Sequence, residues 1–177
     1  MFYNYLGKLI PIFKFSVEKE LENSEVNFLP TRAYNTDTGW DVRANTPNKE
    51  PLYIKLNEYV KINLGIRCFA PKGWWLELKP RSSTFAKKYL HCLYGTIDET
   101  YSGILQLAVT YRPTNNYCID TLYTPPIRIS HGEAIAQIIP VKRKEMFVQQ
   151  ISNEEFEKLC KDRNSQRGDG GFGSTTK

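Results

Sequence analysis

The chain has few residues of the kinds that hold metal ions or form covalent cross-links. Among its 177 residues there are 4 cysteines and 2 histidines, and no two cysteines form a CxxC pair. A structural zinc site therefore has no ligand set. The number and spacing of the cysteines also do not favour a disulfide framework at this length. We expect free thiols in a reducing compartment.

Long apolar runs are also missing. No stretch approaches the roughly 20 residues that a membrane-spanning helix needs. Residues 1–12 are apolar, but no charged region precedes them, so we interpret them as an N-terminal extension and not as a signal peptide. We expect no membrane association and no secretion, and a place in the cytoplasm, or in the nucleus or host-cell interior if the protein is viral.

The charge balance has only a mild bias. The chain carries 24 Lys and Arg against 19 Asp and Glu, a net charge of +5, which favours anionic ligands in general. The basic residues are scattered, and short clusters such as residues 142–144 fit a solvated face. Stable nucleic-acid binding is therefore not expected.

The length of the chain suggests one domain.

Helical patterns are few, and short strand patterns fill most of the chain. Apolar residues alternate with polar ones between 52 and 66, with a period of two. Further strand-like runs cover residues 74–78, 104–111, 118–123, 134–141 and 144–151. Proline and glycine punctuate them. This series predicts an all-β fold, a jelly-roll-like barrel or sandwich.

One or two short helices complete the predicted fold. Ser152 and Glu155 form a capping-box pattern, which predicts a helix near residues 153–161. A second helix is expected after Pro80. The domain is expected to span residues 1–166 and to be followed by a mobile glycine-rich arm, residues 167–177.

Two early segments carry residues that a β core does not need. In the first, residues 38–42 (TGWDV), Asp41 lies between apolar neighbours and needs a partner if buried; taken alone, a turn glycine and a capping aspartate explain it best. In the second, residues 80–83 (PRSS), Arg81 and two serines at a helix start would form an anion site. Capping by serine is the alternative, but it leaves Arg81 without a role.

Two later segments also stand out. Residues 95–103 (GTIDETYSG) predict a hairpin with Asp98 and Tyr101 near its bend. Beside a phosphate cluster, Asp98 would orient and deprotonate a water molecule, although in isolation a β-turn aspartate explains it better. In residues 132–137 (GEAIAQ), Gln137 interrupts an apolar strand and either donates to an anion or faces solvent.

The fifth segment is the tail, residues 167–177 (RGDGGFGSTTK). Arg167 offers a planar charged fork, Phe172 a stacking face, and Ser174 and Thr175 hydroxyl donors. A ligand with an aromatic ring at one end and phosphates at the other would suit this set. Taken alone, a disordered terminus is the simpler interpretation.

In this order, the five segments resemble the motifs of the trimeric deoxyuridine triphosphatase (dUTPase) family. The family patterns are approximately GYDL, PRSG, GxIDxxYxG, GxxIAQ and RGxGGFGSTG. Here they stand as GWDV, PRSST, GTIDETYSG, GEAIAQ and RGDGGFGSTT. Any one of them is weak, whereas five in the right order and at about the right spacing form a specific signal.

The resemblance implies β-rich subunits in a homotrimer, in which each site uses parts of three chains and hydrolyses dUTP to dUMP and pyrophosphate. Mg²⁺ would be held mainly by the phosphates and water, with Asp41 as a supporting acid and not a direct ligand. Asp98 would activate the attacking water, and Tyr101 would pack under the deoxyribose. The other implied substrate-binding residues are Arg81, Ser82, Ser83 and Gln137 toward the phosphates, Gly95, Ile97 and Gln106 toward the uracil, and Arg167, Phe172, Gly173, Ser174 and Thr175 in the closing arm.

Departures from the pattern leave alternatives open. Ser83 replaces a glycine, Cys92 falls where some members have an asparagine that holds the base, and residues 112–130 are longer than typical. A deoxycytidine triphosphate deaminase or a bifunctional enzyme of the same fold is one rival, but Ser102 stands where the deaminases have a glutamate. A regulatory binding module on this scaffold and a single-strand nucleic-acid binder are two others.

Overall fold

The computed structural model describes residues 10–113 and 124–163 of the chain. The chain divides into two compact units, Met1–Arg143 and Lys144–Lys177, which we call the first and second units. The strands described are β1 (Lys14–Val17), β2 (Trp40–Arg43), β3 (Leu52–Ile54), β4 (Tyr59–Asn63), β5 (Ile66–Phe69), β6 (Trp74–Pro80), β7 (Leu90–Cys92), β8 (Gly95–Ile97), β9 (Gln106–Tyr111), β10 (Ile127–Ile129) and β11 (Ala134–Lys142). The helices are α1 (Ser82–Ala86) and α2 (Asn153–Asp162), with two 3-10 turns, η1 (Lys19–Leu21) and η2 (Pro47–Lys49).

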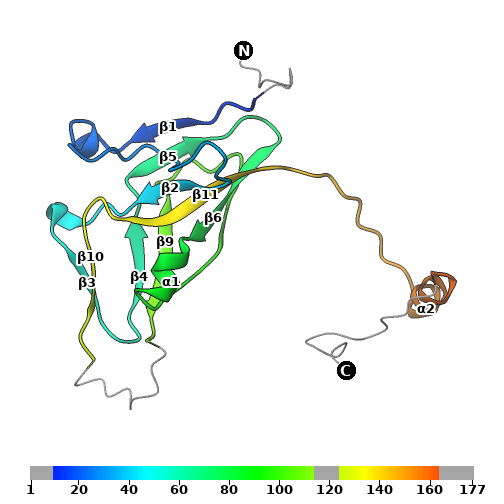
Figure 1. The fold of residues 1–177 in the computed structure, drawn as a ribbon. Helices are drawn as coiled ribbons and strands as arrows, with labels where there is room; N and C mark the ends of the chain where they lie inside the picture. The colour runs from blue at the N-terminus through cyan, green and yellow to red at the C-terminus, as the bar shows by residue number, and fades with distance from the viewer. Residues whose placement is uncertain (1–9, 114–123, 164–177) are drawn as a thin grey trace. The chain divides into compact units, whose positions relative to one another are not determined.

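Antiparallel sheets make up the first unit (Figure 1). The largest has the strand order β2-β11-β6-β8, and a second has the order β4-β9-β7. Two pairs, β1-β5 and β10-β3, complete the set. This arrangement confirms the expected all-β, jelly-roll-like fold.

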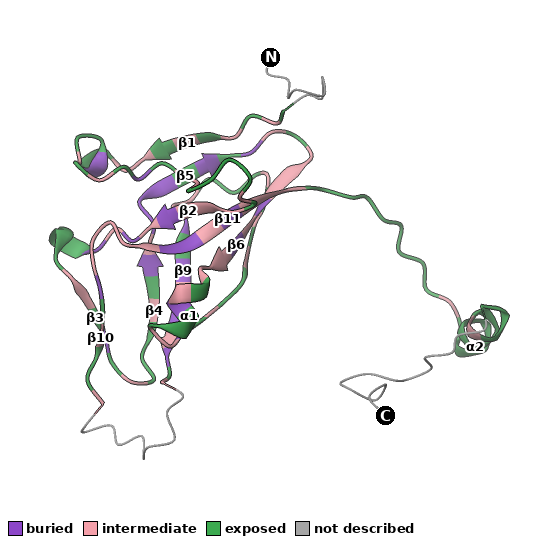
Figure 2. Cartoon of the chain, in the orientation of Figure 1, coloured by how far each residue is buried: buried purple, intermediate pink, exposed green. Residues whose placement is uncertain are grey.

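The alternation in the sequence becomes an alternation of burial (Figure 2). In β9, Leu107, Val109 and Tyr111 are buried, while the residues between them are more accessible. Side chains on successive strand positions point to opposite faces, so a period of two places one face in the core. The core is formed by aliphatic side chains from most strands, among them Val42, Ile54, Ile62, Leu76, Leu78, Leu107, Ile129, Ile135 and Ile138.

The strand β11 lies between β2 and β6 and carries a proline. Its pairing with β2 runs only to Ile138 opposite Trp40, whereas its pairing with β6 continues to Lys142 opposite Trp74. Pro140 therefore lies beyond the end of β2, where β11 is paired on the β6 side. A residue without an N–H is tolerated in such a place.

The turn between β4 and β5 depends on a glycine. Gly65 has φ of 69°, in the left-handed region, and its carbonyl accepts a hydrogen bond from Glu18 N at 2.9 Å. A Cβ at this position would lie 2.5 Å from Leu21 Cδ1 and 3.2 Å from Phe28 Cδ1. Both the backbone conformation and the close packing therefore favour glycine.

Both predicted helices are confirmed. Ser152 caps α2 by accepting a hydrogen bond from Glu155 N at 3.1 Å, as the capping-box pattern indicates. α1 follows Pro80 and Arg81 directly. Among the described residues, no helix combines the length and apolarity needed to cross a bilayer.

Two secondary-structure predictions are wrong. Residues 144–151 form no strand in the structure, because an alternating pattern becomes a strand only where a neighbouring edge takes up its backbone hydrogen bonds. Residues 95–103 are not a hairpin: β8 pairs with β6, and β9 pairs with β4 and β7. The chain passes here from one sheet to the other. The expected strand at residues 118–123 lies outside the described residues.

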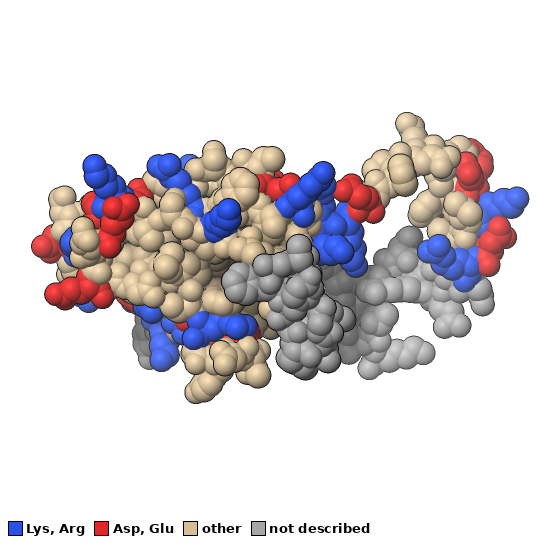
Figure 3. Space-filling view, turned by 90° about the horizontal axis from the view of Figure 1, so that it is seen from above, with Lys and Arg blue, Asp and Glu red and all other residues tan. Residues whose placement is uncertain are grey.

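Charged side chains of both signs are interspersed over the first unit on the face that Figure 3 presents. Several of them form pairs, such as Lys79 with Glu77 at 3.0 Å and Lys88 with Glu133 at 2.9 Å. A mixed surface of this kind is solvated and provides no extended field of one sign.

Candidate active site

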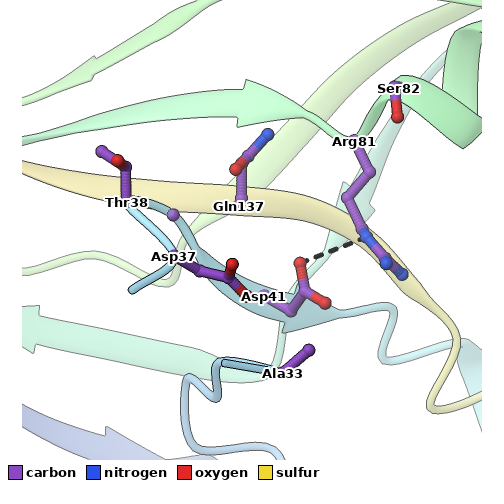
Figure 4. A pocket seen from close by; sticks show the side chains of 8 residues that line it. Ala33, Asp37, Thr38, Asp41, Arg81, Ser82 and Gln137 are labelled. Carbon is purple, nitrogen blue, oxygen red and sulfur yellow. Dashed lines mark ion pairs between the residues drawn. The ribbon is translucent and has the colours of Figure 1, made fainter. Parts of the chain in front are cut away.

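Three of the five motif segments meet around one cavity of about 320 Å³. The segments come from β2, from β11, and from the junction of β6 with α1 (Figure 4). The cavity is lined by Ala33, Asp37, Thr38, Gly39, Asp41, Arg81, Ser82 and Gln137. Of the predicted site residues, the structure therefore brings Asp41, Arg81, Ser82 and Gln137 together.

An ion pair joins the two charged residues of this cavity that the sequence indicated. Asp41 Oδ1 lies 3.1 Å from Arg81 Nε, and Figure 4 shows the two side chains turned toward each other. Arg81 Nη1 also donates to the carbonyl of Ala134 at 3.3 Å. These contacts use part of the five N–H donors of a guanidinium and fix its direction. Asp41 therefore has the partner that its position required, and Arg81 is oriented at the cavity wall.

Backbone hydrogen bonds hold Asp41 in place. Its N–H donates to Thr31 O at 2.6 Å, and its carbonyl accepts from Thr31 N at 3.1 Å. On the other side of β2, Asp41 is in register with Gln137 of β11. The carboxylate thus projects from a strand that is supported along both edges.

A buried threonine, and not a serine cap, anchors α1. Thr84 Oγ1 donates to Ile135 O on β11 at 2.6 Å, and Thr84 N donates to Arg81 O at 3.0 Å. The N-cap residue is Arg81, and no side-chain capping bond is formed at this helix start. Capping by serine is therefore wrong as an account of this segment. The exposed Ser82 reaches the cavity, while Ser83 lies beside it in the first turn, half-buried.

Gly39 makes room for the side chain of Gln137. A Cβ on Gly39 would collide with Gln137 Oε1 and lie 2.8 Å from Gln137 Cδ. Gln137 Nε2 is 3.4 Å from the carbonyl oxygen of Pro80, at the weak end of hydrogen bonding. Of the two interpretations of Gln137, the structure supports the one in which its amide faces a site.

The loop before β2 adds cavity residues that sequence reasoning missed. Asp37 Oδ2 accepts from Tyr34 N at 2.9 Å, and Asp37 O accepts from Arg32 Nη1 at 3.1 Å. The Arg32 guanidinium also lies 4.3 Å from the ring centroid of Trp40, a cation–π distance. Ala33 and Asp37 belong to no regular pattern, so only their nearness to the TGWDV segment could have indicated them.

Asp98 and Tyr101 lie on a separate turn and do not line this cavity. Tyr101 N donates to Asp98 O at 3.0 Å, which closes a β-turn. The Asp98 side chain is exposed, whereas the Tyr101 hydroxyl donates to Ile104 O at 3.1 Å. A Cβ on Gly103 would lie 2.5 Å from that hydroxyl. The glycine therefore lets the tyrosine ring lie against the backbone.

The remaining predicted residues of this region flank the turn. Gly95 and Ile97 pair with Leu78 and Leu76 from the edge strand β8, and Gln106 is the exposed first residue of β9. They form a second group with Asp98 and Tyr101. Within one chain, the structure does not bring this group into the cavity of Arg81.

Cys92, at the end of β7, is half-buried, and its thiol lies 3.5 Å from Leu90 O. Burial raises the pKa of Cys92 from 9.0 to about 11. The side chain is therefore a neutral thiol at neutral pH and a weak hydrogen-bond donor.

The donor set fits a metal ion only if another molecule supplies most of its ligands. In residues 10–113 and 124–163, no cluster of three or more His, Cys, Asp or Glu side chains could hold a metal. The cavity does contain two carboxylates, Asp37 and Asp41. Carboxylates can accept hydrogen bonds from the water shell that Mg²⁺ retains. The residues present therefore fit Mg²⁺ that arrives with a triphosphate.

The predicted arm residues Arg167, Phe172, Gly173, Ser174 and Thr175 lie outside the described residues, as does the boundary after residue 166. Their roles and this boundary stay predictions.

An antiparallel β fold with an arginine, a serine, an amide and carboxylates in one cavity defines an all-β protein of the jelly-roll-like class with a polar, charged site. Residues 27–176 match the family model described as dUTPase. The chain therefore belongs to the dUTPase family. It is 29% identical over 161 residues to the deoxyuridine 5'-triphosphate nucleotidohydrolase of Maricaulis maris, covering 89% of this chain and 93% of that protein. It is 30% identical over 156 residues to the enzyme of that name from Finegoldia magna, covering 86% and 94%.

Solved structures share the fold. A structure of Staphylococcus bacteriophage 80alpha dUTPase with dUPNHPP aligns with a TM-score of 0.69 at 24% identity, over 93% of this chain and 98% of that one. A mutant dUTPase from phage phi11 of S. aureus, whose structure describes a structural Mg(II) ion, aligns with a TM-score of 0.62 at 20% identity, over 80% and 97%.

Proposed function

We propose that the chain hydrolyses dUTP to dUMP and pyrophosphate, and that a homotrimer forms three sites, each built from several chains. Family membership supports the reaction. The assignment rests on one structural observation: the predicted site residues fall into two groups, and neither group alone is a complete active site. Arg81, Ser82 and Gln137 line a cavity suited to an anion, whereas Asp98 and Tyr101 lie on an exposed turn outside it.

The cavity group binds the triphosphate. Arg81 is oriented by Asp41 and Ala134 O, and its planar fork matches phosphate oxygens. The hydroxyls of Ser82 and Ser83 and the amide of Gln137 donate further hydrogen bonds to these oxygens. When bound with the nucleotide, Mg²⁺ neutralises phosphate charge. Asp41 accepts hydrogen bonds from water beside the phosphates.

The turn group performs the proton transfer and selects the nucleoside. Asp98 accepts a proton from a water molecule while the water oxygen bonds to the α-phosphorus. The bond from this phosphorus to the bridging oxygen then breaks, and pyrophosphate leaves. The ring of Tyr101, held by Ile104 O, packs under the deoxyribose and leaves no space for a 2′-hydroxyl. Gly95, Ile97 and Gln106 face the uracil.

Assembly supplies what one chain lacks. Asp98 of one chain would complete the cavity of another, and the arm from Arg167 to Thr175 would close over the ligand, with Phe172 stacked on the base and Gly173 allowing close approach.

A pyrophosphate-release assay on dUTP, dCTP, dTTP and UTP, with Mg²⁺ and with EDTA, tests the proposal. Wild type should hydrolyse dUTP in preference to the others and lose activity in EDTA. Asp98→Asn should lower kcat by about 10²–10⁴-fold, since the amide cannot accept the proton. Its thermal stability should remain unchanged, because the Asp98 side chain is exposed. Glu22→Gln, at an exposed acid after η1, is the matched control and should keep full rate.

Three outcomes would contradict the proposal. Absence of dUTP hydrolysis in the wild type would overturn the reaction. A fully active Asp98→Asn would overturn the role of this carboxylate. Release of ammonia with the triphosphate left intact would instead identify a deaminase.

A further inference from the structure

The residue after Asp98 makes contacts that a solvent-exposed turn does not need. Glu99 Oε2 accepts a hydrogen bond from Gly73 N at 2.7 Å and another from Arg143 Nη1 at 3.1 Å. The Glu99 side chain is 25% exposed, and that of Arg143 is 51% exposed. The Glu99 carboxylate is therefore bound by a backbone donor and a charged donor at once.

A third hydrogen bond closes this group, because Arg143 N donates to Gly73 O at 2.8 Å. Gly73 thus uses both its N–H and its carbonyl in the group, and its φ of 78° lies in the left-handed region. A Cβ at Gly73 would meet no heavy atom within 4 Å, so the backbone conformation and not the space favours glycine there. We call Glu99, Gly73 and Arg143 the anchor.

The anchor and Tyr101 both hold the turn that begins at Asp98. Glu99 is the second residue of the turn that Tyr101 N closes onto Asp98 O, and the Tyr101 hydroxyl is fixed by Ile104 O. Asp98 comes directly before Glu99, and its side chain is exposed. A turn in solvent ordinarily samples several conformations, so side-chain attachments at two residues of the same turn restrict the directions available to the Asp98 carboxylate.

We propose that Glu99 is a positioning residue for Asp98: through Gly73 and Arg143 it holds the turn in the conformation that aims the Asp98 carboxylate. This inference rests on the proposed function, in which Asp98 accepts the proton of the attacking water. Glu99 touches neither water nor nucleotide in this mechanism. Its effect should fall on the chemical step, because a misplaced base slows proton transfer without removing the phosphate contacts of Arg81.

Substitutions at both ends of the anchor test this role. Glu99→Ala removes both acceptor bonds and should lower kcat about 10- to 100-fold, the range expected for a displacement of about 1 Å. Its KM should change less than about twofold, because the cavity residues are intact. Glu99→Gln keeps an oxygen that can accept from Gly73 N–H but loses the charge that attracts Arg143. Its kcat should therefore lie between those of Glu99→Ala and the wild type. Arg143→Met should give a similar intermediate rate.

The controls separate positioning from damage to the fold. Glu77→Ala removes a carboxylate that pairs with Lys79 on the same sheet, with a side-chain exposure of 31%, and should leave kcat unchanged. Titration with dUPNHPP counts competent sites in each variant, so that kcat is expressed per site. The backbone amide of Gly73, followed by NMR, should lose its protection from hydrogen exchange in Glu99→Ala and keep it in Glu77→Ala.

Each outcome distinguishes the two proposals. A wild type without dUTP hydrolysis overturns the proposed function and this role with it. An active wild type combined with a fully active Glu99→Ala overturns only the positioning role. A rate loss that tracks the number of competent sites or appears in KM also overturns it, since the anchor would then be structural.

Discussion

A methyl group on Gly39 should disable the cavity while leaving the fold almost intact. In Gly39→Ala, the new Cβ falls on Gln137 Oε1, 2.8 Å from Gln137 Cδ and 3.2 Å from Gln137 Cβ. Gly39 is not among the positive-φ glycines, so the penalty is steric. The atoms in the way belong to the end of a flexible side chain, which can rotate. The loss of stability should therefore be about 1 kcal/mol, at the low end of overpacking costs.

The functional cost should be larger than the cost to stability. Once displaced, the Gln137 amide no longer faces the cavity and cannot donate to a phosphate oxygen. A hydrogen bond to a charged group contributes about 1.5–3 kcal/mol. This range corresponds to about a 10- to 150-fold fall in kcat/KM for dUTP.

A double-mutant cycle tests this explanation. Gln137→Ala alone should cause the same loss, and adding Gly39→Ala to it should change kcat/KM little, because the group that the methyl displaces is already absent. The assay is steady-state pyrophosphate release, with thermal unfolding measured in parallel. Full activity of Gly39→Ala, or additive losses in the double variant, would refute the reasoning.

Two further predictions concern stability. Burial, and then the charge of Lys49, lower the pKa of His131 below its ordinary value of 6.5, and His131 Nδ1 accepts a bond from Thr46 N at 3.3 Å. As pH falls, His131 is therefore protonated at a higher pH in the unfolded chain than in the folded protein. The stability that the neutral imidazole gives the fold is present above the ordinary pKa and is lost progressively as the pH falls below it. The free energy of unfolding measured with urea should fall between about pH 7 and about pH 5, and His131→Gln should make it less dependent on pH. A wild type that becomes more stable as the pH falls over that range would contradict the predicted sign. Gly65→Ala should lower the free energy of unfolding by about 2–5 kcal/mol, from the left-handed φ and overlap with Leu21, whereas an unchanged denaturation midpoint would show that the turn relaxes.

Local patterns in the sequence predicted much of the fold. The period of two in β9 and the capping box at Ser152 both correspond to elements of the structure. Each of these patterns is formed by residues that are close together in the sequence. The strand expected at 144–151 has the same pattern but is absent. A strand also needs an edge to pair with, and alternation does not say whether one is available.

The site was predicted as a set of motifs, but not in its arrangement. That Asp41 and Arg81 pair at 3.1 Å follows from the register of β2, β11 and β6, which no segment specifies alone. The predicted hairpin around Asp98 is wrong for the same reason, since β8 pairs with β6 whereas β9 pairs with β4. Asp37 was missed because its place depends on a loop conformation.

Because the cavity and the Asp98 turn do not meet within one chain, activity should depend on protein concentration and on which variant chains are present together. If neither half is active alone, the rate per chain should fall steeply once the concentration drops below the level at which subunits associate. A chain defective at Arg81 and a chain defective at Asp98 should restore some activity when mixed, since a cavity from the second can meet a turn from the first. Selection would then act on the surfaces that bring copies together as strongly as on the residues that carry out the reaction.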